Sequence, residues 1–106
     1  MARALVNVPK SARRGEVIEI KTLLSHAMET GHRTGPNGTI LPRDIVERFS
    51  CTYNGVVVFE ADLHPAISAN PYLVFTTVAR ESGTIALTWS GDNGFAQTET
   101  ALIVVT

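Results

Sequence analysis

The dipeptide Asn54-Gly55 constrains the fold of this chain more than any other feature of its sequence. It separates two β-favouring runs, Phe49–Tyr53 and Val56–Leu63, and Asn-Gly is the pair that best tolerates the positive φ values of a tight type I′ turn. The sequence therefore predicts a central antiparallel hairpin. A two-residue turn also sets the register. In that register Tyr53 faces Val56, Cys51 faces Val58 and Phe49 faces Glu60, while Ser50, Thr52, Val57 and Phe59 point the other way.

Apolar side chains then lie on both faces of this predicted hairpin. Such a hairpin is suited to an inner pair of strands, since its second face needs at least partial cover from other strands or from a partner chain. We therefore expect it in the interior of a sheet.

Length and composition predict one folded domain over residues 1–106. The chain is 44% hydrophobic and 18% charged, which is enough for a core without disulfide or metal staples. Its single cysteine, Cys51, can form no intramolecular disulfide and leaves the redox compartment open. The residues show no signal peptide and no run approaching the ~20 apolar residues that span a bilayer. From the residues alone we expect a cytoplasmic chain without membrane contact.

Charge is distributed unevenly along the sequence, although the net charge of -1 argues against a general nucleic-acid binder. Residues 1–53 hold eight basic and five acidic side chains, net +3, whereas residues 54–106 hold one basic side chain, Arg80, and five acidic ones, net -4. The two halves mix in space in a compact fold, which favours ordinary solvated surface charge. The alternative is a pair of oppositely charged patches that steer partners or small anions.

Alternation and turn signals predict about seven strands and no helix. The clearest strand is Glu16–Leu24, in which Ile18 and Ile20 face the core and Val17, Glu19, Lys21 and Leu23 face the other way. The remaining expected elements are strands at Ala4–Val8, Tyr72–Ala79, Thr84–Ser90 and Phe95–Val105, a basic turn at Lys10–Gly15 and the start of a strand at Asp44–Arg48. This pattern is typical of an all-β, immunoglobulin-like antiparallel β-sandwich, with a small open barrel as the structural alternative.

Two irregular segments interrupt the strands. Ser25–Arg43 contains three glycines and two prolines, and predicts a long loop with a small ribbon that turns at Asn37-Gly38. His64–Pro71 contains two X-Pro bonds and predicts a shaped linker without regular structure. Long ordered loops in small domains usually have a function.

No set of residues in the sequence assembles a reaction centre. His26, Met28 and His32 offer ligands suited to copper, but a blue-copper site also needs a thiolate, and the only thiol is expected in mid-sheet. Cys51 is expected to face Val58, and apolar surroundings raise a thiol pKa, so we interpret it as structural. We expect no enzyme activity, no metal and no cofactor.

Longer segments of the sequence resemble a known family. They are IEIKTLLSHAMETG (Ile18–Gly31), LPR (Leu41–Arg43), FSCTYNGVVVFEADL (Phe49–Leu63), HPAISANPYLVF (His64–Phe75) and SGTIALTWSGDNG (Ser82–Gly94). Together they cover nearly the whole chain and are similar to SoxZ, a subunit of the Sox sulfur-oxidation system. ISANPYLxF together with SHxMETG is specific, because neither follows from generic β-sandwich composition. One departure is Ala27, where the family commonly has proline.

The resemblance implies a binding role. SoxZ forms a periplasmic carrier with SoxY, in which thiosulfate-derived sulfur is held on a cysteine in a glycine-rich C-terminal arm of SoxY and presented to the pathway enzymes. The sequence ends in TALIVVT rather than in such an arm, so we expect that Cys51 does not inherit the carrier role. The resemblance implies an obligate heterodimer with a SoxY-like protein and transient contacts with other Sox enzymes. It also implies export in complex with a partner that bears a twin-arginine signal, which replaces the cytoplasmic expectation.

A function of a different class is the alternative. It is a free-standing immunoglobulin-like domain that binds a metal or small ligand through the loop of residues 25–43. An adjacent SoxY-like chain would favour the first function, and protein isolated alone with bound copper would favour the second.

Both irregular segments are predicted to dock partners, because loops fixed on a rigid sandwich usually carry its contacts. The competing explanation for the linker is structural, since Pro65 and Pro71 fix two backbone angles and Asn70 can bond to nearby backbone amides. The candidate docking residues are His26, Met28, Glu29, His32 and Arg33 in the loop, and Ile67, Ser68, Asn70, Pro71 and Tyr72 at the linker.

Overall fold

The strand with the clearest alternation is the middle strand of a three-stranded sheet. In the computed structural model, which describes residues 3–106, β3 (Val17–Leu24) lies between β1 (Ala4–Asn7) and β6 (Tyr72–Val78), antiparallel to both. Ile18, Ile20 and Leu24 are buried, as predicted, because every second side chain of a strand points to the same face.

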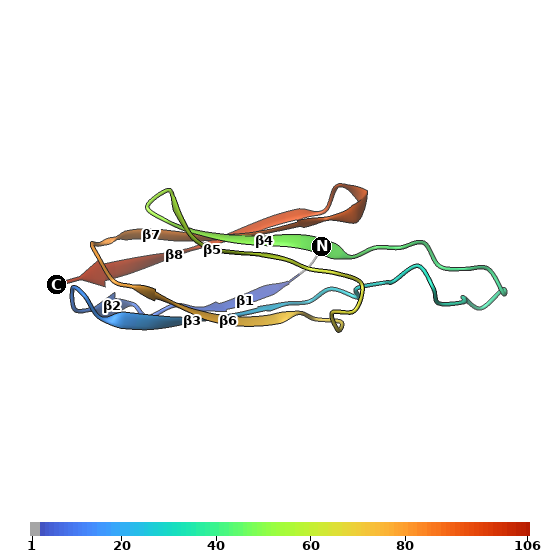
Figure 1. Ribbon diagram of the computed structural model, residues 1–106, viewed down its shortest axis with the longest axis horizontal. Helices are drawn as coiled ribbons and strands as arrows, with labels where there is room; N and C mark the ends of the chain where they lie inside the picture. The colour runs from blue at the N-terminus through green and yellow to red at the C-terminus, as the bar shows by residue number, and fades with distance from the viewer. Residues whose placement is uncertain (1–2) are drawn as a thin grey trace.

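A five-stranded sheet packs against this first sheet and completes a β-sandwich (Figure 1). Its order is β2 (Ser11–Ala12), β8 (Ala96–Val105), β7 (Gly83–Gly91), β4 (Val46–Tyr53) and β5 (Val56–Asp62). The predicted all-β, immunoglobulin-like sandwich is confirmed. Pairing is antiparallel except between β2 and β8, which are parallel. The short strand β2 lies inside the segment Lys10–Gly15, for which only a turn was predicted. Residues 3–106 contain no α-helix, only the single 3-10 turn η1 (Asp92–Gly94).

The central hairpin forms at Asn54-Gly55, whose φ angles of 49° and 83° fit the predicted turn. Tyr53 faces Val56 as predicted, but the rest of the predicted register is wrong. A β-bulge between Cys51 and Thr52 places Val58 as an extra residue on β5, so that Cys51 faces Phe59 rather than Val58. Phe49 consequently faces Ala61 rather than Glu60.

The bulge also turns Phe59 toward the core, opposite to the predicted direction. Its ring stacks on that of Phe75 from β6, with centroids 4.4 Å apart and an angle of 7° between the ring planes. The hairpin was predicted to lie in the interior of a sheet. This is confirmed for β4, which has a neighbouring strand on each side, and is wrong for β5, which is the edge strand of the sheet.

The core lies between the two sheets and is centred on aromatic rings. Phe49 and Trp89 are fully buried, with ring centroids 5.2 Å apart, and Phe75 packs against Phe49 at 5.8 Å. Aromatic pairs at these separations add to the free energy of apolar burial. The other fully buried residues are Ile20, Leu24, Ile45, Val46, Cys51, Thr22, Ala79, Ile85, Leu87 and Ile103.

The segment Ser25–Arg43, called the ribbon loop below, projects beyond the sheets along the long axis of the molecule (Figure 1). Its arms are joined by backbone bridges between Thr34 and Ile40 and between Glu29 and Asp44, and Gly38 has a φ of 76° at the tip. The predicted ribbon with a turn at Asn37-Gly38 is confirmed. Within residues 3–106, no helix is long and apolar enough to cross a membrane.

Candidate partner interface

The outer face of the central hairpin is more polar than the sequence predicted. Because Phe59 turns inward, the outward side chains at the far end of β5 include Glu60 and Asp62, which bind the guanidinium of Arg48 at 2.5 and 2.8 Å. Val57, at 52% exposed, is the large apolar side chain left on this face of the hairpin. The expected apolar contact surface therefore has to lie elsewhere.

An exposed apolar row crosses the outer face of the three-stranded sheet instead. Leu5 of β1 is paired with Leu23 of β3, and Leu23 is paired with Tyr72 of β6, so the three side chains lie side by side. Leu5 is 60% exposed, Tyr72 58%, and Val74, two residues further along β6, 44%. We call Leu5, Leu23, Tyr72 and Val74 the apolar face.

A shallow hollow of about 170 Å³ adjoins the apolar face. It is lined by Arg3, Leu5, Leu23, Ser25 and Asn70, so apolar side chains line its sheet side and polar groups its rim. Further along β3 the outward positions are taken by Glu19 and Lys21, an exposed ion pair at 3.5 Å. Apolar side chains with a polar rim are typical of protein–protein contact surfaces.

The structure joins the predicted loop and linker at one point, beside this hollow. Asn70, with a φ of 55°, accepts a hydrogen bond from the backbone N–H of His26 through its side-chain oxygen at 3.0 Å. Its own backbone N–H donates to the carbonyl of His26 at 2.7 Å. The carbonyl of Pro71 accepts from Leu24 N–H at 3.1 Å, where β6 begins. Asn70 thus holds the two segments together, which is the structural role weighed for it, and Tyr72 reaches the apolar face.

The other candidate docking residues of the linker lie away from the sheets. Ile67 is 38% exposed, and its backbone N–H donates to the carbonyl of His64 in a tight turn. Ser68 is exposed. Neither lines the hollow.

Two of the proposed copper ligands are engaged in internal hydrogen bonds. His26 Nδ1 accepts from the backbone N–H of Met28 at 3.0 Å, and Met28 Sδ accepts from Val46 N–H at 3.3 Å. Met28 is buried, whereas His32 is exposed on the ribbon loop. Binding a metal at either Nδ1 or Sδ would therefore require a backbone hydrogen bond to break.

The charged pair of the ribbon loop is ordered by its own contacts. Arg33 binds Glu29 through Nη2 at 2.7 Å and through Nε at 3.2 and 3.3 Å. These hydrogen bonds to Arg33 lower the pKa of Glu29 below its ordinary value. The side chain of Arg33 is 70% exposed against 17% for Glu29, so the outward charge of the pair belongs to the arginine.

Cys51 is fully buried, as the structural interpretation requires. It faces Leu87 on one side and Phe59 on the other, and burial raises the pKa of its thiol to about 11. A neutral, enclosed thiol is a poor nucleophile. Its position therefore fits a core side chain.

One residue of the apolar face is recognisable from the sequence alone. Leu23 stands on the outward side of a strand whose inward side is already apolar. Leu5 and Val74 could be joined to it only with the strand order in hand, because local sequence does not say which strands pair.

Comparison with solved structures shows the same architecture in other proteins. A superoxide reductase (neelaredoxin) from Ignicoccus hospitalis matches with a TM-score of 0.75 at 13% identity, over 97% of this chain and 80% of that one. A putative superoxide reductase from Thermotoga maritima matches with a TM-score of 0.71 at 14% identity, over 97% and 85%. The sulfur carrier protein SoxY from Chlorobium limicola f thiosulfatophilum matches with a TM-score of 0.66 at 12% identity, over 97% and 78%. At these identities the likeness concerns the fold alone.

Comparison of the sequence itself is more specific. No curated protein matches it. The family model described as "Sulphur oxidation protein SoxZ" matches residues 6–102, which includes every strand except the first residues of β1 and the last of β8. The chain therefore belongs to the SoxZ family, a family of the Sox sulfur-oxidation system.

Proposed function

We propose that this chain is the non-catalytic subunit of a heterodimeric sulfur carrier, in which a SoxY-like partner bears the cysteine that holds thiosulfate-derived sulfur. The observation that carries the proposal is the match of residues 6–102 to the SoxZ family. The role of this chain is to support and orient the partner while pathway enzymes act on the bound sulfur.

The apolar face supports the proposal physically. Leu5, Leu23 and Tyr72 form one contiguous row on the outer face of the three-stranded sheet, where Leu5 and Tyr72 are 60% and 58% exposed. Large exposed apolar patches usually mark contact surfaces, since they are costly to leave in water. SoxY from Chlorobium limicola f thiosulfatophilum has a similar fold, and two sandwiches can pack sheet against sheet. The partner we assign to the apolar face is therefore a second sandwich of the SoxY type.

The burial of Cys51 supports the proposal that the partner, and not this chain, bears the sulfur-carrying cysteine. A carrier thiol must reach several enzymes in turn, whereas Cys51 lies enclosed between the two sheets with a raised thiol pKa. We assign the sulfur to the partner for this reason. We further propose a periplasmic location, reached by export of the folded pair, on the basis of the family.

Co-expression tests the proposal directly. The chain and a SoxY-like protein are purified together, and size-exclusion chromatography with light scattering measures their mass at micromolar concentration. We expect a one-to-one complex that buries more than about 1,200 Å² in total. Mass spectrometry after thiosulfate turnover should find the sulfur adduct on the partner and none on Cys51. A chain that stays monomeric beside its partner, or an adduct on Cys51, contradicts the proposal.

Cell fractionation tests the proposed location separately. The chain should appear in the periplasm only when the partner carries its export signal. Deletion of that signal should leave both proteins in the cytoplasm. A chain that is exported without the partner contradicts co-export but leaves the carrier role intact.

A further inference from the structure

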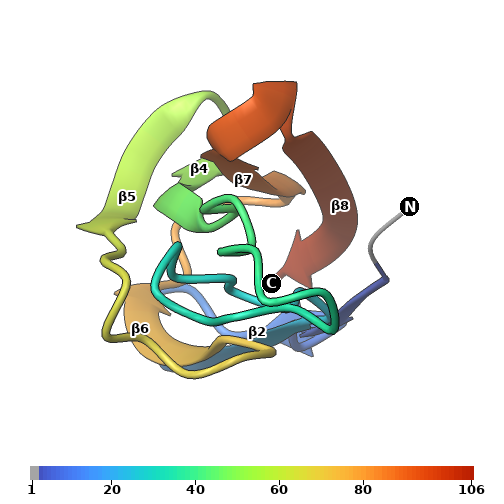
Figure 2. The same cartoon turned by 90° about the vertical axis from the view of Figure 1, so that its right-hand side faces the viewer.

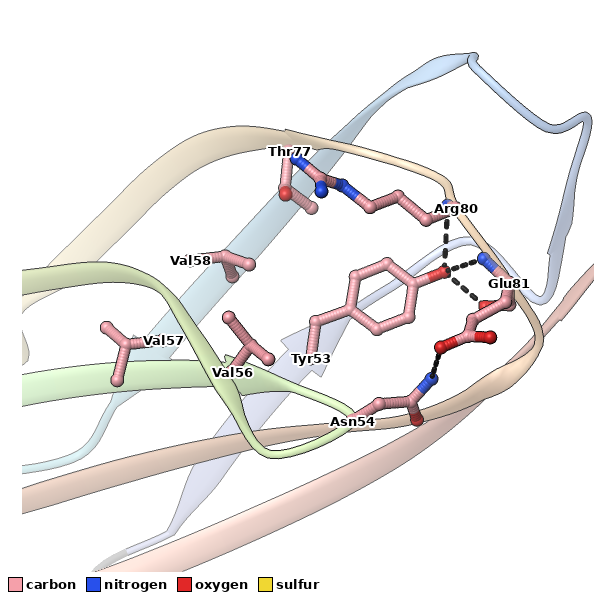
Figure 3. Close-up of a pocket in the computed structure, with 8 residues that line it drawn as sticks. All are labelled: Tyr53, Asn54, Val56, Val57, Val58, Thr77, Arg80 and Glu81. Carbon is pink, nitrogen blue, oxygen red and sulfur yellow. Dashed lines mark hydrogen bonds between the residues drawn. The ribbon is translucent and has the colours of Figure 1, made fainter.

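Both sheets end on the same side of the sandwich. The five-stranded sheet ends there with β5 and the three-stranded sheet with β6, and the linker passes from one to the other on that side (Figure 2). Midway along, the gap between these strands is filled by the stacked rings of Phe59 and Phe75. Nearer the hairpin turn a hollow of about 470 Å³ opens, which we call the edge hollow (Figure 3).

One wall of the edge hollow is an apolar strand edge. Val56, Val57 and Val58 line it, and the first two are 66% and 52% exposed. Sheet edges are usually protected by charge, by proline or by a covering segment, because their free backbone groups pair readily with other chains. The far half of β5 has such protection in Glu60 and Asp62, whereas the valine segment has neither charge nor proline and is modified only by the bulge at Val58.

The opposite rim carries an arginine held in a fixed position. The hydroxyl of Tyr53 accepts hydrogen bonds from the backbone N–H groups of Arg80 and Glu81, both at 3.2 Å, and donates to the carbonyl of Glu81. Tyr53 itself is buried, at 5% exposed, so this anchor belongs to the core. The backbone at Arg80 is thereby fixed beside the hollow.

The guanidinium of Arg80 has no carboxylate partner among residues 3–106. Figure 3 shows its side chain extended toward Thr77, while the neighbouring Glu81 extends the other way and accepts a hydrogen bond from Asn54 Nδ2 at 3.4 Å. Arg80 is also the one lysine or arginine in the sequence from 54 to 106. The edge hollow thus combines an apolar strand edge with a positive charge available for pairing.

We propose that the edge hollow binds an extended segment of a partner polypeptide, which pairs with β5 as an additional strand and places a carboxylate on Arg80. The free edge selects an extended backbone, since strand addition satisfies its donors and acceptors. The valines favour apolar side chains on the segment, and the guanidinium selects the carboxylate through charge-assisted hydrogen bonds. This site goes beyond the proposed function, because it is separate from the apolar face and does not depend on which protein covers that face.

Synthetic peptides test this site on the full chain. The probes are acetylated octapeptides of alternating threonine and valine, each with one aspartate at a different position, beside the same peptides with asparagine. A third set carries its carboxylate only at a free C-terminus, which distinguishes a side-chain from a terminal carboxylate. Fluorescence anisotropy gives affinity, and amide chemical shifts locate the contact.

We expect the best carboxylate peptide to bind about tenfold more tightly than its asparagine or amidated counterpart, which corresponds to one good charge-assisted contact. The amides of Val56, Val57 and Arg80 should shift on binding. Arg80→Gln should remove the preference for the carboxylate. Arg14→Gln should keep it, because Arg14 is another exposed arginine that has no ion pair within the described part of the chain. N-methylation of alternate peptide amides should weaken binding, because it blocks strand pairing.

Four results would overturn the inference. They are no binding by any carboxylate peptide, equal affinity of carboxylate and neutral peptides, equal effects of Arg80→Gln and Arg14→Gln, and shifts confined to the apolar face. A concentration-dependent dimer of the isolated chain that Val56→Lys abolishes would also overturn it, since the occupant would then be a second copy. Because the Arg80 side chain forms no ion pair with any of residues 3–106, Arg80→Gln should fold normally, and its melting temperature checks this.

Discussion

The rings of Phe59 and Phe75 lie 4.4 Å apart and nearly parallel, one from the last strand of each sheet. This contact joins the two sheets on the side where neither continues into a further strand. It depends on the bulge at Val58, because without the extra residue Phe59 would point outward. A local irregularity of one residue thus closes the core.

Replacing Phe59 with alanine should lower the free energy of unfolding by about 2 kcal/mol, less than for a fully buried phenylalanine because the ring is only half-buried. Val57→Ala, at the outward neighbour on the same strand, should change it by less than about 0.5 kcal/mol. Denaturant unfolding of both variants measures the difference. Equal effects would mean that the stacked ring of Phe59 contributes no more to stability than the exposed side chain of Val57.

Cys51 should resist thiol reagents in the folded protein. Burial raises the pKa of its thiol from 9.0 to about 11, so the thiolate is scarce near neutral pH and the sulfur is enclosed as well. The neutral buried thiol contributes stability that is complete below pH 9 and is lost as pH rises toward 11, because the unfolded chain ionises first.

Cys51→Ala tests both points. It should cost on the order of 1 kcal/mol at neutral pH and should flatten the decline of stability between pH 9 and 11. Thiosulfate turnover of the reconstituted carrier should remain nearly unchanged. Rapid labelling of the folded wild-type thiol at pH 8 would contradict its burial.

Asp92 should stabilise the protein in a pH-dependent way. Its carboxylate accepts from Arg43 through two bonds of 2.8 Å and from the backbone N–H of Ile45 at 3.1 Å. The hydrogen bonds from Arg43 lower the pKa of Asp92 below 3.8. Its contribution is therefore present above pH 3.8 and is lost as pH falls through the lowered folded-state value.

Asp92→Asn should accordingly melt several degrees lower at neutral pH, and the difference should shrink in acid. Asp62→Asn is the matched control, since Asp62 also pairs with an arginine but is 66% exposed. That variant should melt close to the wild type. A difference for Asp92→Asn that is constant down to the most acidic pH would show that charge is not the cause.

The apolar face should be required for the proposed heterodimer. Leu5→Asp combined with Tyr72→Asp should weaken the complex by about a hundredfold or more, because two central apolar contacts are lost and two charges are buried. Leu102→Asp is the control, since Leu102 is 75% exposed on the outer face of the other sheet. Calorimetric titration with the partner measures each affinity, and a loss with Leu102→Asp instead would move the interface to the five-stranded sheet.

The ribbon loop is expected to affect the docking of pathway enzymes. Reversing the exposed charge with Arg33→Glu should slow association severalfold at low salt and less at high salt, with little change in melting temperature. The exchanged pair Glu29→Arg with Arg33→Glu controls for loss of the ion pair itself. Equal association rates for all three proteins at every ionic strength would exclude the loop as a docking site.

Much of the fold could be predicted because local pattern and tertiary structure agree. The alternation of Ile18, Ile20 and Leu24 matches their burial, and the positive φ angles of Asn54 and Gly55 match the turn. The bulge escaped prediction for a physical reason. Val56 to Phe59 are all apolar, so either register buries an apolar side chain and the hydrophobic pattern does not decide between them.

The candidate interfaces were harder to predict than the fold. The outward position of Leu23 was visible in the sequence, but its neighbours Leu5 and Tyr72 are 18 and 49 residues away along the chain and meet it only through strand pairing. Hydrogen bonds from Asn70 to nearby backbone amides were predicted as the structural alternative for the linker. The observed partner, His26, is 44 residues away in the sequence and was not predicted. The free edge of β5 depends on strand order, which no local pattern specifies.

The extra residue at Val58 also determines how related sequences should be aligned. From Phe59 onward each residue of β5 points to the face opposite to the one it would take in a strand without the bulge. The inward and outward alternation of the strand therefore reverses at Val58. A homologue can have one residue fewer between the Asn-Gly turn and the aromatic residue and still keep that ring in the core. In the alignment of such a homologue with this chain, the gap belongs at the bulge. A gap placed later in β5 would align inward residues of one protein with outward residues of the other. The substitutions then read from the alignment along β5 would be alignment errors.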